Sequence, residues 1–219
     1  MLLKQIVSYL WPLTKKIKTA NNGLLEINWI NGKKYLDSKN ANYSYGTLQR
    51  VLEFGLEKTD FSSIKNVLLL GLGGGSVIHS LRKKIGFRGN ITAVEIDEVV
   101  IEIAENEFKV SGNENLKIIR EDARLFVESC KNKFGLVIID LFIDTRVHDD
   151  FYSMKFWEGV IRLMDSGGFF IFNAGMGDEG NKKADFLYQK LKQIIYPEKF
   201  DRVEGGNTLL IGKKVINIL

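Results

Sequence analysis

Four positions between residues 71 and 140 combine residue types that can bind a nucleoside and accept a proton. Gly71 opens the run Gly71-Leu72-Gly73-Gly74-Gly75, and Glu95, Asp122 and Asp140 each follow a short apolar run. Glycine tolerates positive φ and lets the backbone approach a ligand closely. An acid about 20 residues beyond such a turn can reach ribose hydroxyls, and Glu95 follows Gly71 by 24 residues. A carboxylate can also serve as a general base.

Apolar runs that alternate with helix-like segments must position these residues. The apolar runs cover residues 67–70, 91–94, 116–119 and 136–139, and the helix-like segments cover 77–84, 98–110 and 123–131. This alternation predicts a parallel sheet with helices on both faces. Ligands of such sheets lie outside the carboxyl ends of the strands, so we expect the glycine turn and the three acids to face one crevice.

The second half of the chain is predicted to complete this sheet. Its expected elements are helices at 154–164 and 183–195 and strands at 168–173, 200–203 and 208–212, the last two forming a hairpin. The polar segment 142–153 has no clear period and is predicted to be an active-site lid. The predicted fold class is therefore α/β, with a seven-stranded methyltransferase-like (Rossmann-type) sheet. A seven-stranded sheet that ends in a hairpin distinguishes methyltransferase-type folds from two-halved nicotinamide-binding folds. The terminal hairpin therefore favours a sulfonium nucleoside as the ligand over a nicotinamide or flavin cofactor.

A small N-terminal unit is predicted to precede this domain. The runs 24–30 and 34–37 flank Asn31-Gly32, which is the preferred dipeptide of a two-residue hairpin turn. A helix is then expected over 45–58. We divide the chain into an N-terminal β-hairpin unit, residues 1–46, and a nucleoside-binding α/β domain, residues 47–219.

The composition predicts a globular protein with one main core and without a nucleic-acid or membrane partner. The 219 residues, 45% of them hydrophobic, suffice for one main core. Lys and Arg outnumber Asp and Glu by 31 to 27, but they are scattered, which indicates solvated surface and no nucleic-acid partner. Cys130 has no second cysteine to pair with. Residues 1–13 are too short to span a bilayer. We expect a cytoplasmic protein without a membrane partner, and the sequence leaves a homodimer open.

Histidines and acids outside the main pattern receive simpler interpretations. Two histidines and one cysteine without clustered spacing predict no metal site. His79 lies in an expected helix and is interpreted as a packed or surface residue. His148, beside Asp149-Asp150 in the expected lid, is a weak candidate for a substrate contact. Asp97 is expected to cap the helix that follows it.

Together the motifs resemble those of the spermidine synthase (polyamine aminopropyltransferase) family. The resemblance rests on Leu70-Gly71-Leu72-Gly73-Gly74-Gly75, Val94-Glu95-Ile96-Asp97, Glu121-Asp122-Ala123, Ile139-Asp140 and, in the N-terminal unit, Tyr35-Leu36-Asp37 before Tyr43-Ser44-Tyr45-Gly46. It spans roughly residues 24–175.

The resemblance implies roles for individual residues. The cofactor would be S-adenosylmethionine or its decarboxylated form, without a metal, and its implied contacts are Gly71, Gly73, Gly74, Glu95 and Asp122. Glu95 would bind both ribose hydroxyls, and Asp122 would accept from the adenine amino group. Asp140 matches the first aspartate of the family's catalytic Asp-Ser-Ser-Asp element and would deprotonate the acceptor amine. Tyr45 and Asp144 are further candidates for contact with that amine.

The chain departs from the family pattern near the expected acceptor. Its element reads Asp140-Leu141-Phe142-Ile143-Asp144, so Ile143 stands in place of the second aspartate and an acid follows one position later. The Tyr43-Ser44-Tyr45-Gly46 segment lacks the family's glutamate. We therefore carry three functions: aminopropyl transfer to an amine, which leads; small-molecule methyl transfer from S-adenosylmethionine; and a non-catalytic nucleoside-binding scaffold.

Overall fold

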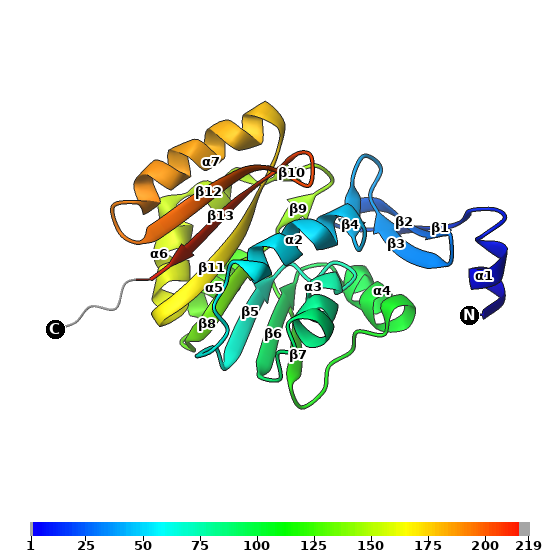
Figure 1. The fold of residues 1–219 in the computed structure, drawn as a ribbon, viewed down its shortest axis with the longest axis horizontal. Coiled ribbons are helices and arrows are strands. Elements are labelled where there is room, and N and C mark those ends of the chain that lie inside the picture. Colours follow the sequence, from blue (N-terminus) through cyan, green and yellow to red (C-terminus); the bar gives the residue numbers. More distant parts are fainter. Residues whose placement is uncertain (1, 215–219) are drawn as a thin grey trace.

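The expected seven-stranded sheet forms in the computed structural model, which describes residues 2–214 (Figure 1). Its strands are β5 (Asn66–Leu70), β6 (Asn90–Glu95), β7 (Leu116–Arg120), β8 (Phe134–Ile139), β11 (Met164–Met176), β12 (Tyr196–Val203) and β13 (Asn207–Lys213). They lie in the order β12-β13-β11-β8-β5-β6-β7. Strand β13, inserted between β11 and β12, runs antiparallel to both, and the other neighbouring pairs in this sheet are parallel. The predicted fold class is confirmed.

Each face of the sheet carries its own apolar core, because successive strand residues point to opposite faces. Leu69 belongs to the core on one side and Leu68 and Leu70 to the core on the other. The first face is covered by α2 (Thr47–Glu57), α3 (Ser76–His79) and α4 (Glu98–Phe108), and the second by α5 (Ala123–Ser129), α6 (Met154–Leu163) and α7 (Gly177–Leu191). Strands buried on both faces explain why the sequence shows continuous apolar runs.

Polar residues at the strand ends begin several helices. The Asp97 side chain accepts from the Val99 amide and caps α4, as predicted, and Asp122 caps α5 by accepting from the Arg124 amide. The segment 77–84 differs from the prediction, since α3 is short and passes into a π-helical turn, Ser80–Lys84. Helix α7 begins six residues before the predicted start. The acidic residues in its first turn stabilise this earlier start, because their negative charge lies at the positive end of the helix dipole.

The N-terminal unit contains more strands than the predicted hairpin. After α1 (Leu2–Val7), β1 (Leu13–Thr19), β2 (Gly23–Ile30), β3 (Lys33–Asp37) and β4 (Asn42–Ser44) form an antiparallel sheet in sequence order. The β2–β3 hairpin turns at Asn31-Gly32 with positive φ at both residues, as expected. Strand β1 was not predicted because its Lys-rich sequence is mostly exposed and lacks an apolar face. The division at residue 46 stays a prediction.

The expected lid, residues 142–153, contains regular structure. Strands β9 (Phe142–Ile143) and β10 (Arg146–Val147) form a short hairpin that is followed by a 3₁₀ turn, Asp149–Tyr152. Asp144 lies in the hairpin turn, where its carboxylate accepts from the Ser38 hydroxyl at 2.7 Å and the Asn40 amide at 3.0 Å. These bonds attach the hairpin to the turn between β3 and β4. Within residues 2–214, no helix is both long and apolar enough to cross a bilayer.

The first glycine of the Gly-rich turn carries a testable steric requirement. Gly71 has φ +92°, and a Cβ there would lie 2.1 Å from the Asp140 carbonyl oxygen. We expect Gly71→Ala to lower the free energy of unfolding by more than about 3 kcal/mol, since backbone strain alone costs about 1–3 kcal/mol. Gly23→Ala is the matched control, because Gly23 has φ +70° but its Cβ would meet no other atom within 4 Å. Equal losses in urea unfolding would contradict the steric argument.

Candidate functional site

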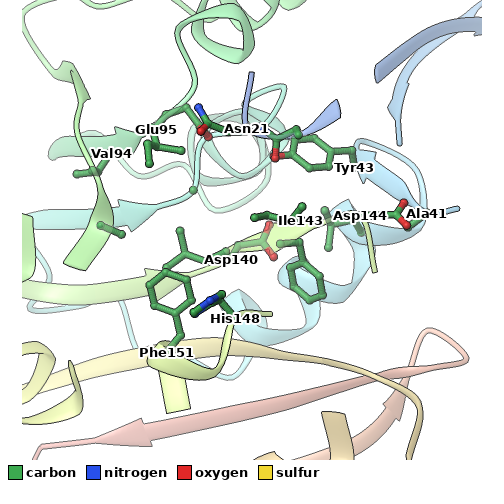
Figure 2. Close-up of a pocket in the computed structure, with 18 of the residues that line it drawn as sticks. Asn21, Ala41, Tyr43, Val94, Glu95, Asp140, Ile143, Asp144, His148 and Phe151 are labelled. Atoms are coloured by element: carbon green, nitrogen blue, oxygen red, sulfur yellow. The ribbon is translucent and has the colours of Figure 1, made fainter. Parts of the chain in front are cut away.

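A cavity of about 420 Å³ lies where the sequence predicted the crevice, at the carboxyl ends of β5, β6 and β8 (Figure 2). The expected site residues that line it are Gly71, Gly73, Glu95, Asp122, Asp140, Asp144 and His148. Its volume falls in the range of small-molecule sites, about 300–1,000 Å³. The structure thus brings together the glycine turn, the three acids that follow strands and part of the expected lid.

Two expected site residues, Tyr45 and Gly74, lie outside this lining. The Tyr45 ring stacks on Phe108 with centroids 4.6 Å apart, and its hydroxyl contacts His79 Nδ1 and donates to the Gly74 carbonyl at 3.2 Å. A Cβ on Gly74 would come within 3.0 Å of Ser44. Both residues therefore hold β4 against the Gly-rich turn. Burial lowers the pKa of His79, in keeping with a packed role.

Glu95 is fixed at the end of β6 by the backbone of the Gly-rich turn. One carboxylate oxygen accepts from the Leu72 amide at 3.1 Å, and the other accepts from the Asp97 amide at 3.0 Å. Burial raises the pKa of Glu95, since the side chain is only 6% exposed. Each oxygen of an ionised carboxylate has further acceptor capacity. Glu95 can therefore accept from hydroxyl groups of a ligand in the cavity.

Asp140 is a cavity acid whose protonation can change near neutral pH. Its Oδ1 accepts from Asn173 Nδ2 at 3.0 Å, and Asn173 Oδ1 accepts from Asn207 Nδ2 at 3.0 Å. Burial raises the pKa of Asp140 to about 7; the bond from Asn173 opposes this rise, and the charge of Glu95 adds to it. Near pH 7 this carboxyl can therefore both accept and release a proton.

The other two acids in the expected set have strong local partners. Asp122 accepts from Arg124 Nε at 3.1 Å and Nη2 at 2.6 Å, and these bonds lower the pKa of Asp122. Hydrogen bonds from Asn40 and Ser38 lower the pKa of Asp144. Both carboxylates are ionised at neutral pH and can serve as acceptors. The exposed His148 accepts from the Asp150 amide at 3.3 Å.

Several polar residues of the site were missed by the sequence analysis. Asn21 and Asn22, in the β1–β2 turn, line the cavity, and each donates to Asp97, at 3.2 and 3.0 Å. Tyr43 also lines it and donates to Asn22 Oδ1 at 2.8 Å. These positions come from a separate sheet, so no local motif identifies them. Asn173 ends an apolar run, and the rule that identified Glu95 would have found it.

Residues 2–214 contain no group of three or more His, Cys, Asp or Glu side chains arranged to hold a metal ion.

A match to a protein-family model shows which family the chain belongs to. Residues 51–199 match the Spermine/spermidine synthase domain. The chain belongs to this family. The resemblance inferred from the sequence motifs is thereby confirmed, and the matched segment contains the Gly-rich turn, Glu95, Asp122 and Asp140.

Members of the spermine/spermidine synthase family and methyltransferases both occur among its relatives. A polyamine aminopropyltransferase of Buchnera aphidicola is 26% identical over 143 residues, which are 63% of this chain and 50% of that protein. An eEF1A lysine and N-terminal methyltransferase homolog of Drosophila melanogaster is 26% identical over 186 residues, 76% of this chain and 27% of that protein. The chain thus spans about a quarter to a half of these relatives.

The fold of this family member is also similar to that of a solved methyltransferase-like protein. Human Methyltransferase-like protein 13, solved in complex with SAH, superposes with a TM-score of 0.62 at 22% identity. The alignment covers 78% of this chain and 83% of the human one. It shows that the sheet and its helices follow the methyltransferase arrangement.

Proposed function

We propose that this protein is a transferase that binds S-adenosylmethionine or its decarboxylated form and transfers an aminopropyl group to an amine. The observation that carries the proposal is the Asp140 carboxyl, which faces the same cavity as Glu95 and has a pKa of about 7. Membership of the spermine/spermidine synthase family supports the same reaction class.

The residues around the cavity fit an adenosyl ligand. A ribose presents two hydroxyl donors, and the ionised form of Glu95, held rigidly at the cavity wall, is an acceptor-only group. Asp122 offers a second acceptor for the amino group of the base, and it is oriented by Arg124. At Gly73, which has φ +52°, the chain passes the cavity without a side chain. These features support binding of the nucleoside with its tail directed towards Asp140.

The chemistry requires a group that holds an amine and removes its proton. A sulfonium ligand supplies an electrophilic carbon and a neutral thioether leaving group. The ionised Asp140 would orient the acceptor ammonium and take one proton, freeing the nitrogen lone pair to form the new C–N bond as the C–S bond breaks. Asn173 keeps one Asp140 oxygen occupied, so the other is available to the amine.

Methyl transfer to an amine is the second candidate. Ile143 stands where the family has its second aspartate, and Phe142, Phe151 and Met176 make the nearby lining apolar. The fly relative, named as a lysine and N-terminal methyltransferase homolog, also favours an amine acceptor. A cavity closed by side chains would favour the scaffold, whereas this cavity holds about 420 Å³. A small-molecule acceptor, a cytoplasmic location and a homodimer stay predictions.

Product analysis separates these functions. Purified full chain is incubated with decarboxylated or ordinary S-adenosylmethionine and with putrescine, spermidine or simple monoamines, and the products are identified by mass. We expect an aminopropylated amine from the decarboxylated ligand. Methylated amine from the ordinary ligand alone would replace the leading proposal by the second. Tight nucleoside binding without product from any pair would support the scaffold.

The pKa of Asp140 predicts a pH dependence. A carboxyl with a pKa of about 7 is protonated below that pH and ionised above it. Because the base form does the work, kcat/KM should rise about tenfold per unit below pH 7 and level off above it. The profile of kcat/KM for the acceptor amine, measured at saturating nucleoside, should therefore have its acid midpoint near 7. A limb with a midpoint near 4 would contradict the assignment.

Asp122 is predicted to read the nucleobase. Asp122→Asn replaces a pure acceptor by an amide that can also donate, so the preference for adenosyl over inosyl ligands should relax or reverse. Calorimetric titration with both ligands measures this ratio. If the carboxylate only caps α5, the variant will lose stability and keep its ligand preference. Asp150→Asn removes the second partner of Arg124 and serves as the matched control.

A further inference from the structure

Two buried asparagines, one on β11 and one on β13, form a series of hydrogen bonds that ends at the Asp140 carboxylate. Asn173 follows the apolar centre of β11 and is fully buried, and Asn207 begins β13 and is 4% exposed. Asn207 Nδ2 donates to Asn173 Oδ1, and Asn173 Nδ2 donates to Asp140 Oδ1, both at 3.0 Å. Neither asparagine belongs to a motif that identifies the family in this chain.

The Asp140 carboxylate, at the end of this series of hydrogen bonds, determines which group donates in each of them. An ionised carboxylate can only accept, so Asn173 must turn its NH₂ group towards Asp140. Its carbonyl oxygen then faces Asn207, which must donate in turn. Asn173 pairs with Leu209 of β13, two residues from Asn207, and the register of β11 against β13 is irregular between residues 173 and 176. The Asn173 amide therefore has one orientation that satisfies both of its neighbours.

We propose that Asn173 and Asn207 are positioning residues that hold the Asp140 carboxylate in one orientation and favour its ionised form. One oxygen, Oδ1, is occupied by Asn173, and within residues 2–214 no side chain or amide bonds the other. The backbone is fixed as well, since the Asp140 amide donates to the Leu70 carbonyl at 2.9 Å. The inference rests on the proposed function only in assigning Asp140 the acceptor's proton.

The other titratable groups around the cavity affect Asp140 differently from Asn173. Those that line it are Tyr43, Glu95, Glu121, Asp122, Arg124, Asp144 and His148. Among these, Glu95 disfavours a second negative charge, and Arg124 is engaged by Asp122 and Asp150. The bond from Asn173 is the contact that lowers the pKa of Asp140. Its loss should therefore move the titration of Asp140 upwards.

The test is a direct titration of the Asp140 carboxyl in the ligand-free full chain, followed by carbon NMR of labelled aspartate and assigned with Asp140→Asn. Asn173→Leu keeps the approximate volume and removes the donor, and should raise the Asp140 midpoint by about 1–2 units. Asn207→Leu leaves the Asn173 amide free to rotate and should raise it by less. Thr208 lies beside Asn207 on β13, and Thr208→Val removes part-buried bonds to Asn181 in α7 and Asp201 in β12, so it should leave the midpoint unchanged.

The titration midpoints distinguish a positioning role of the two asparagines from a role in packing alone. An unchanged midpoint in folded Asn173→Leu, or equal shifts in Asn207→Leu and Thr208→Val, would overturn the proposal. If Asn173→Leu does not fold, Asn207→Leu against Thr208→Val decides alone. Because the titration needs no substrate, failure of the proposed transferase reaction would not affect it. In an active enzyme, the acid limb of kcat/KM should move by the same amount as the midpoint.

Discussion

Asp140→Asn should lower turnover by roughly 10²–10⁴-fold while leaving nucleoside affinity nearly unchanged. The amide keeps the shape of the side chain but cannot take the proton that the acceptor amine must lose. Asp140 is not among the residues that hold the Gly-rich turn, which is bonded to Glu95. Binding and chemistry should therefore separate, with calorimetry giving the affinity and product formation giving the rate.

A control variant tests whether the loss of any nearby negative charge would lower turnover. Asp149 is exposed, pairs with Lys183 and lies outside the cavity lining, so Asp149→Asn should retain turnover within a few-fold. Similar losses in both variants would indicate a general electrostatic effect. A wild-type rate in Asp140→Asn would remove Asp140 from the mechanism.

Glu95→Ala should weaken binding of the adenosyl ligand by about 1.5–3 kcal/mol, or roughly 10- to 150-fold in Kd. Hydrogen bonds to a charged acceptor are worth this much, and the variant leaves two ribose hydroxyls without that acceptor. It also leaves the Leu72 and Asp97 amides without their partner. Affinity and thermal unfolding of the ligand-free protein should therefore be measured together.

Glu98→Ala provides the comparison for the loss of a nearby acid. Glu98 begins α4, is exposed and pairs with Arg120 outside the cavity, so this variant should bind as the wild type does. Wild-type affinity in Glu95→Ala would reject the assignment of Glu95 to the ribose. A loss of affinity that matched the loss of stability would indicate damage to the Gly-rich turn instead.

The sequence by itself determined the sheet and the group of residues at its carboxyl edge. Apolar runs such as Val67-Leu68-Leu69-Leu70 are strands because both faces are buried, and residues that end parallel strands share one edge. Gly71, Glu95, Asp122 and Asp140 could therefore be placed on one cavity before its geometry was known. The positions of the apolar runs along the sequence are enough for this prediction, and no knowledge of long-range contacts is needed.

Tertiary structure alone decided which residues from distant segments complete the site. Tyr43, and not Tyr45, lines the cavity, because the ring of Tyr45 packs on Phe108. The pairing of β11 with β13 brings Asn207 to Asn173 and so to Asp140. Burial, which sets the pKa of Asp140 at about 7, depends on all surrounding elements at once. Such contacts join residues that no local pattern relates, so the sequence determined the edge of the sheet and packing determined its chemistry.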